Sequence, residues 1–156
     1  MKIDHPDLHR VVLETRSTIG EQMRETVHRW LREYNTSANP DFFAALDRGG
    51  SEPLFITAQA SDRSVLGGLL GNTLLKWLRI DIVAVAPAVR RSGIGRLLMT
   101  EAERHAQKRG CSAAYVDTMS YQSPEFYRRL GYSEVGRTPN WDSHGHTKYY
   151  FTKHLE

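Results

Sequence analysis

A short basic run at residues 90–96, with the sequence RRSGIGR, has the composition of an anion-binding turn. It follows an apolar, mostly β-branched segment at residues 82–85. Gly93 and Gly95 have no side chains, so an anion can approach the backbone N–H groups of the turn. A helix beginning here would add the positive end of its dipole, and the three arginines add charge. The chemistry predicted for this turn is the binding of phosphate groups.

Asp81 is the one acidic residue in the apolar segment at residues 78–85. It lies two residues before Val83, which predicts that both side chains lie on one face of a strand. A carboxylate in this place can relay a proton from a substrate, or it can be a structural or solvent-facing group. The sequence leaves both interpretations open.

The elements that position these groups follow from the spacing of apolar residues. Residues 82–85 read as a buried strand that ends at Pro87, which has no N–H to donate to a sheet. Ile94, Leu97 and the apolar residues after them recur at helical spacing, which predicts a helix to about Gly110. A strand, a glycine turn and a helix therefore follow one another.

The whole chain alternates between strand and helix patterns. Strands are predicted over residues 8–14, 54–59, 65–70, 74–85, 113–118, 132–136 and 148–153, and further helices over residues 19–34, 40–46 and 124–130. Asn39 and Ser123 are expected to cap the two helices that begin at prolines. The fold class is mixed α/β, with a twisted, mostly antiparallel sheet of about seven strands and helices on both faces. No linker divides residues 1–156, which predicts a single domain.

Composition excludes several classes of protein. The 156 residues carry a net charge of +3 without a long basic run, which argues against nucleic acid as a partner. Cys111 is the only cysteine, so no internal disulfide can form. No apolar stretch approaches the roughly 20 residues that cross a membrane. A cytoplasmic location, without a membrane or a metal ion, is the simplest expectation.

Two sequence blocks resemble the GNAT superfamily of N-acetyltransferases. Residues 83–95, VAVAPAVRRSGIG, are similar to its acetyl-CoA signature. Residues 123–132, SPEFYRRLGY, are similar to its fourth helix. The resemblance extends over residues 65–136 and implies an acetyl-CoA-dependent enzyme that acetylates a primary amine by direct attack in a ternary complex.

The resemblance also implies roles for particular residues. The strand with Val83 and the next strand in the sheet would splay apart to admit acetyl-CoA, with a backbone N–H near Val83 facing the developing oxyanion. Tyr127 would protonate the departing thiolate, or would only pack against the pantetheine arm, and Asp81 would relay the proton of the amine. The residues implied to bind acetyl-CoA are Val83, Val85, Arg90, Arg91, Ser92, Gly93, Ile94, Gly95, Arg96, Ser123 and Tyr127.

Three functions fit these residues. A bulky loop with Trp141 indicates a closed pocket and favours a small-molecule amine as the acceptor. The alternatives are a protein or peptide N-acetyltransferase and a non-catalytic acyl-CoA binding module. His144 and His146 in the same loop could line the acceptor pocket or could be exposed. A homodimer is what the family suggests, and the sequence itself leaves the oligomeric state open.

Overall fold

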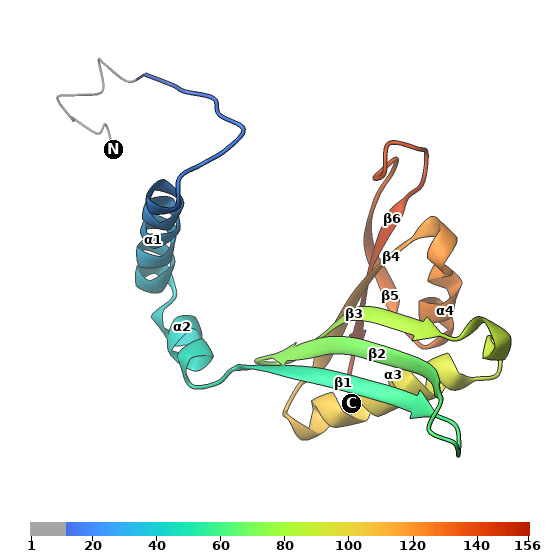
Figure 1. The fold of residues 1–156 in the computed structure, drawn as a ribbon. Helices are drawn as coiled ribbons and strands as arrows, with labels where there is room; N and C mark the ends of the chain where they lie inside the picture. The colour runs from blue at the N-terminus through green and yellow to red at the C-terminus, as the bar shows by residue number, and fades with distance from the viewer. Residues whose placement is uncertain (1–11) are drawn as a thin grey trace. The chain divides into compact units, whose positions relative to one another are not determined.

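The computed structural model describes residues 12–156 (Figure 1). They belong to two compact units, one ending at Phe43 and the other formed by Ala44–Glu156. The strand predicted at residues 8–14 lies mostly outside the described residues, and residues 12–14 form no strand. No helix in this part of the chain is long and apolar enough to cross a membrane.

The first unit contains α1 (Glu21–Ala38) and the beginning of α2 (Pro40–Asp47). Both predicted helices are therefore confirmed, and the side chain of Asn39 accepts the Phe42 N–H at 3.3 Å as a cap. Within this unit no residue of α1 is buried. A unit of this size cannot enclose a core of its own.

The second unit is built on a six-stranded, mixed and mostly antiparallel sheet, where about seven strands were predicted. The predicted strand that is missing among the described residues is the one at residues 8–14. Its strands are β1 (Ser51–Gln59), β2 (Val65–Leu74), β3 (Trp77–Val85), β4 (Ala113–Met119), β5 (Ser133–Thr138) and β6 (Lys148–His154). Their order is β1-β2-β3-β4-β6-β5, and β3 with β4 is the parallel pair. Strands β1, β2 and β3 form an antiparallel meander.

Helix α3 (Ile94–Lys108) packs on β1, β2 and β3 (Figure 1). Gly67 of β2 permits this approach, because a Cβ there would lie 2.8 Å from the Ala84 carbonyl oxygen and 3.2 Å from the Ile94 side chain. The largest fully buried side chains come from the sheet and from this helix: Phe151, Leu69, Leu78, Met99 and Val116.

Strands β3 and β4 pair over only part of their length. The register joins Trp77–Ile80 to residues 113–116 and then stops. We call the unpaired region beyond Ile80 and Val116 the fork. Beyond it β3 leads through a short 3-10 helix, η2 (Pro87–Val89), to α3, while β4 leads through η3 (Ser120–Gln122) to α4 (Pro124–Arg129). The splay that the family resemblance implies is thus confirmed. The glycine turn follows one of the two strands that form it, and α4 follows the other.

Candidate active site

A cavity of about 830 Å³ lies at the fork, between β3, the start of α3 and α4. It is lined by Val83, Val85, Arg90, Arg91, Gly93, Ile94, Gly95, Arg96, Gln122, Ser123, Phe126, Tyr127, Arg129 and Leu130. The structure therefore brings together all the predicted binding residues except Ser92. The Ser92 hydroxyl instead donates to the Val89 carbonyl at 2.6 Å, which closes the turn rather than facing the cavity.

The glycine turn presents the features that an anion requires. Gly93 is the residue before the first turn of α3, and its φ of +92° is a backbone conformation that glycine adopts without strain. The first N–H groups of α3 have no partner within the helix, and no side chain caps them. They are therefore available to a ligand. Arginines 90, 91 and 96 surround this end. A phosphate-bearing ligand fits a cavity with such a wall.

Gly95 is required for a second reason. A Cβ at this position would lie 3.2 Å from the ring of Phe126, so a side chain here would push α4 away from α3. A change at Gly95 would therefore disturb packing as well as ligand binding, and the substitution at Gly93 is the cleaner probe of the turn.

Backbone groups of β3 are free to pair with a ligand. The Ala86 N–H donates to the Leu66 carbonyl at 2.8 Å, which fixes the phase of the β2–β3 ladder. Hydrogen-bonded pairs alternate along an antiparallel ladder, so Val83 and Val85 direct their N–H and C=O groups away from β2. Beyond Ile80 that side of β3 has no strand partner. An extended amide chain can occupy it as an added strand.

Tyr127 forms the inner wall of the cavity. Tyr127 is only 8% exposed and is more buried than Phe126, its neighbour in α4, and Leu130, the residue after that helix. It packs against the ring of Phe151 with the centroids 6.0 Å apart. Burial raises the pKa of its phenol, and the charge of Asp117 raises the pKa further. The hydroxyl is therefore protonated near neutral pH and can act as a proton donor.

Asp81 occupies a different face from the one predicted. In the β2–β3 register Leu70 stands opposite Ile82, and the next residue, Gly71, stands opposite Ile80. Asp81 has no partner of its own and is therefore the extra residue of a β-bulge. Val83 packs against the core, while Asp81 is exposed and pairs with Arg79 at 2.7 Å. The prediction that Asp81 and Val83 share a face is wrong, because it assumed a regular strand. Asp81 does not line the cavity, although it lies at the fork.

Residues at the start of α4 complete the opposite wall. Ser123 adopts a left-handed conformation with φ +61°, and its side chain does not cap the helix as expected. A backbone of this kind in a residue other than glycine is a strain of about 1–3 kcal/mol that is typical of functional sites. Sequence reasoning missed four lining residues: Gln122, Phe126, Arg129 and Leu130. Of these, only Arg129, a cation within the block at residues 123–132, carried a usable signal.

The loop between β5 and β6 holds the two histidines in place. The Asp142 carboxylate accepts the backbone N–H groups of His144 at 3.0 Å and His146 at 3.2 Å. It also pairs with Nδ1 of His146 at 2.6 Å. These bonds, chiefly the one from His144, lower the pKa of Asp142. The loop histidines are exposed and do not line the cavity at the fork.

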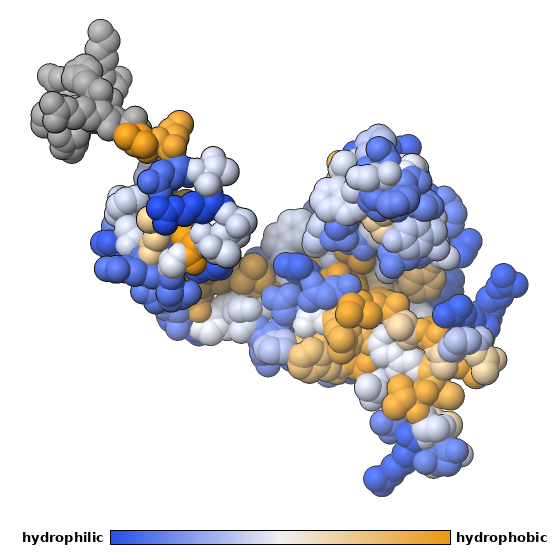
Figure 2. All heavy atoms as spheres, turned by 45° about the horizontal axis from the view of Figure 1, so that its top comes forward, coloured by the Kyte–Doolittle hydropathy of each residue, from blue (hydrophilic) through white to orange (hydrophobic). Residues whose placement is uncertain are grey.

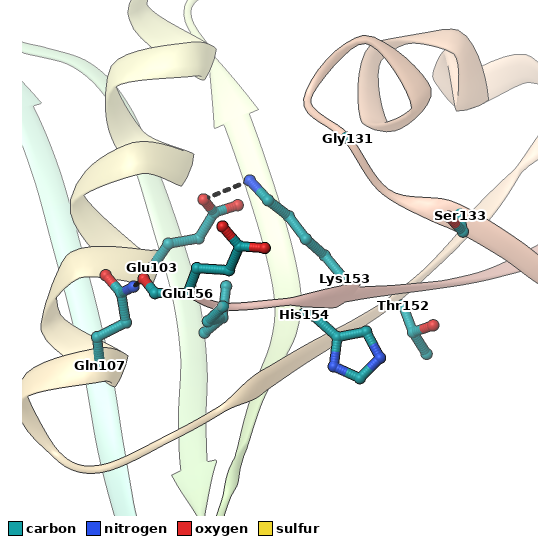
Figure 3. Close-up of a pocket in the computed structure, with 9 residues that line it drawn as sticks. Glu103, Gln107, Gly131, Ser133, Thr152, Lys153, His154 and Glu156 are labelled. Carbon is teal, nitrogen blue, oxygen red and sulfur yellow. Dashed lines mark hydrogen bonds and ion pairs between the residues drawn. The ribbon is translucent and has the colours of Figure 1, made fainter.

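A second cavity of about 680 Å³ lies between α3 and β6 (Figure 3). Glu103 and Lys153 form an ion pair of 2.7 Å in its wall, and the Gln107 side chain donates to the Glu156 carbonyl. This cavity includes neither the glycine turn nor the fork. The cavity at the fork is therefore the candidate active site.

Comparisons with known proteins agree with this geometry. The model of the acetyltransferase (GNAT) family matches residues 20–132. An acetyltransferase from Agrobacterium fabrum is 42% identical over 83 residues, which are 53% of this chain and 61% of that relative. Blasticidin-S acetyltransferase from Streptomyces morookaense is 33% identical over 104 residues, which are 65% of this chain and 76% of that relative.

The fold also matches solved structures. The crystal structure of an acetyltransferase from Bacillus cereus superposes with a TM-score of 0.76 at 27% identity. The superposition covers 91% of this chain and 98% of that protein.

Proposed function

The chain belongs to the GNAT family of acetyl-CoA-dependent acetyltransferases, and from this premise we propose that it acetylates a primary amine of a small molecule. The observation that carries the proposal is the cavity at the fork. It combines a basic glycine turn, free backbone groups on β3 and a buried phenol. These are the groups needed to hold a thioester of a nucleotide and to assist its cleavage.

The substrate acetyl-CoA would be held at two places. Its phosphates would bind the N–H groups at the start of α3 and the arginines beside them. Its pantetheine arm would pair with Val83 and Val85 in the free edge of β3. This arrangement brings the thioester to the fork, where Tyr127 forms the wall.

The transfer then needs three aids. The acceptor nitrogen, as a neutral amine, attacks the thioester carbonyl carbon, and a free N–H of β3 near Val83 stabilises the negative oxygen. The carbon–sulfur bond breaks, and the Tyr127 phenol donates its proton to the sulfur. The acceptor first loses a proton from its ammonium group, and Asp81, at the bulge, would take this proton through water. The nitrogen, now bonded to the acetyl carbon, releases its second proton to the Tyr127 phenolate, which restores the phenol. The products are an acetylated amine and coenzyme A, and the proton that Asp81 took passes to water.

A small amine is favoured as the acceptor by one relative, which is named for the acetylation of blasticidin S. The bulky loop after β5 also favours it, because its Trp141 ring lies over Nζ of Lys148, the lysine that pairs with Asp117 of β4.

The test is a panel of acceptors incubated with acetyl-CoA, in which the release of the coenzyme A thiol is measured. We expect turnover with at least one small primary amine and none with a lysine-containing peptide. Turnover with the peptide alone would move the function to protein acetylation. Acetyl-CoA binding without thiol release on any acceptor would indicate a binding module.

A further inference from the structure

We propose that Asp117 binds the ammonium group of the acceptor at the fork, and that Lys148 occupies the same carboxylate until the acceptor displaces it. The inference rests on the proposed acetyl transfer and names the chemical class of the acceptor, a positively charged alkylamine. It assigns a specificity-determining role to a residue that lies outside the cavity for acetyl-CoA.

Asp117 lies at the entrance of the fork. The parallel pairing of β3 and β4 ends at Ile80 and Val116, and Asp117 is the next residue of β4. Continued register would place it opposite Asp81, the bulge residue of β3. Two carboxylates therefore flank the point where the strands separate.

Asp117 reaches the fork from the face opposite the cavity. Its neighbours Val116 and Thr118 are buried, while Asp117 is partly exposed, as the alternation of a strand requires. Val116 packs in the core with α3, so Asp117 lies on the other face of the sheet. Its charge still raises the pKa of Tyr127. Together with the register, this places a carboxylate at the fork on the face from which an amine could approach the thioester.

The structure already contains an ammonium group at this carboxylate. Nζ of Lys148 lies 2.8 Å from Asp117 Oδ1. The same nitrogen is 4.7 Å from the centroid of the Trp141 ring and 5.8 Å from that of the Tyr150 ring. A carboxylate with aromatic rings beside it is a setting that binds alkylammonium ions. Lys148 is itself a primary alkylammonium, the class of group that the acceptor would bring.

Apolar surface lies on the same side of the sheet. Figure 2 shows hydrophobic side chains gathered on the second unit. In the register, Phe55, Leu70 and Ile82 stand opposite one another across β1, β2 and β3, and all three are exposed. The alkyl part of an amine can lie on such a row while its charged end reaches the fork.

A purely structural ion pair makes a different prediction. Asp117 and Lys148 retain 35% and 20% exposure, and a partly exposed pair of this kind contributes little to stability. The Tyr115 hydroxyl also donates to Asp117 at 3.2 Å, so the carboxylate keeps a partner when the lysine leaves. If the pair is only structural, replacing Asp117 and replacing Lys148 should act in the same direction. If Lys148 competes with the acceptor, replacing Asp117 should weaken amine binding and replacing Lys148 should strengthen it.

The experiment measures the dissociation constant of n-butylamine by NMR titration of the full chain with saturating coenzyme A. The uncharged n-butanol serves as the comparison ligand. We expect Asp117→Asn to bind n-butylamine about tenfold more weakly, the loss of one charge-assisted hydrogen bond. Lys148→Met should bind it at least about threefold more tightly, because the internal competitor is gone. Asp62→Asn, at an exposed carboxylate of the β1–β2 turn, is the matched control and should equal the wild type.

Three results would overturn the inference: no preference of the wild type for n-butylamine over n-butanol, equal affinities in Asp117→Asn and Asp62→Asn, or weaker binding in Lys148→Met. A coenzyme A titration of each variant separates this failure from that of the proposed function. If only this inference is wrong, every variant still binds coenzyme A with normal affinity. If the wild type binds no coenzyme A, the proposed function itself is contradicted.

Discussion

Asp81 and Tyr127 approach the fork from two sides of β3. The carboxylate of Asp81 is partly exposed and pairs with Arg79, whereas the phenol of Tyr127 is buried in the wall of the cavity. A proton acceptor for the amine and a proton donor for the sulfur must lie on opposite sides of the reacting carbonyl. The bulge at Asp81 produces this separation, because it turns the carboxylate away from the face that Val83 shares with the core.

The role of Asp81 is tested by Asp81→Asn. We expect kcat to fall by roughly 10²-fold at a pH below the pKa of the amine, where deprotonation is needed, with acetyl-CoA affinity unchanged. The deficit should shrink as the pH rises and the amine loses its proton without help. The measurement is a pH–rate profile with the best acceptor, with Asp62→Asn as the control. A profile that superposes on the wild type would make Asp81 a structural residue.

At the scale of elements, the connection from β3 to α3 determines where phosphates bind. Gly93 has open space around its Cα but a φ of +92°, so a side chain there is strained without a clash. Gly49, at the end of α2, has φ +87° and equally open space. The two glycines share a backbone conformation and differ in their distance from the cavity, which makes them a matched pair.

Gly93→Ala and Gly49→Ala should both destabilise the fold by about 1–2 kcal/mol, the strain of a left-handed alanine. Only Gly93→Ala should weaken acetyl-CoA binding, by roughly tenfold, because its backbone must turn the helix N–H groups toward the ligand. Calorimetric titration and thermal unfolding measure the two effects. Equal acetyl-CoA affinities in both variants would remove the phosphate site from this turn.

Local patterns in the sequence were sufficient to predict the end of β3, the glycine turn, α3 and the start of α4 at Pro124. The reason is that propensity and the spacing of apolar residues act over a few residues. The parallel pairing of β3 with β4 is what a crossover through α3 requires. The glycines of β2 indicate a bulge or a close backbone approach, and Gly71 lies at the register shift, where a Cβ would be 2.3 Å from the Arg79 carbonyl oxygen. That Asp81 is the extra residue did not follow, because it depends on the register of β3 against β2. The orientation of Ser92 and the pairing of Asp117 with Lys148 likewise depend on contacts made only in the folded chain.

At the scale of the whole molecule, surface carboxylates make stability depend on pH. Arg104 and His105 surround Glu101 on α3, and these contacts, chiefly the hydrogen bond from Arg104, lower the pKa of Glu101 from 4.5 to about 2. The Arg128 side chain likewise lowers the pKa of Glu134. A carboxyl with a lower pKa in the folded state adds stability above its unfolded pKa and loses it as the pH falls toward the folded one.

We therefore expect the melting temperature to be nearly constant from pH 7 to 5 and to decrease between about pH 4.5 and 2. Glu101→Gln should make this decrease smaller, because the substituted side chain no longer titrates. Glu25→Gln, at an exposed residue of α1, is the control. The melting temperature is measured by thermal unfolding at several pH values. The same acid dependence in Glu101→Gln and the wild type would contradict the contribution of Glu101.

The central claim is that the cavity at the fork is the active site and that Tyr127 protonates the leaving thiolate there. Two buried tyrosines allow a matched test. Tyr127 lines the cavity, whereas Tyr132 is 3% exposed, does not line it, and has a hydroxyl without a hydrogen-bond partner among the described residues. Substitution by phenylalanine keeps each ring and removes only the hydroxyl.

The measurement is the single-turnover rate of thiol release from acetyl-CoA in Tyr127→Phe and Tyr132→Phe. We expect a decrease of roughly 10²–10⁴-fold for Tyr127→Phe, with acetyl-CoA affinity within about twofold of the wild type. Tyr132→Phe should react at the rate of the wild type. A Tyr127→Phe variant that releases thiol within about twofold of the wild-type rate would contradict the proton-donor role and leave this tyrosine as a packing residue.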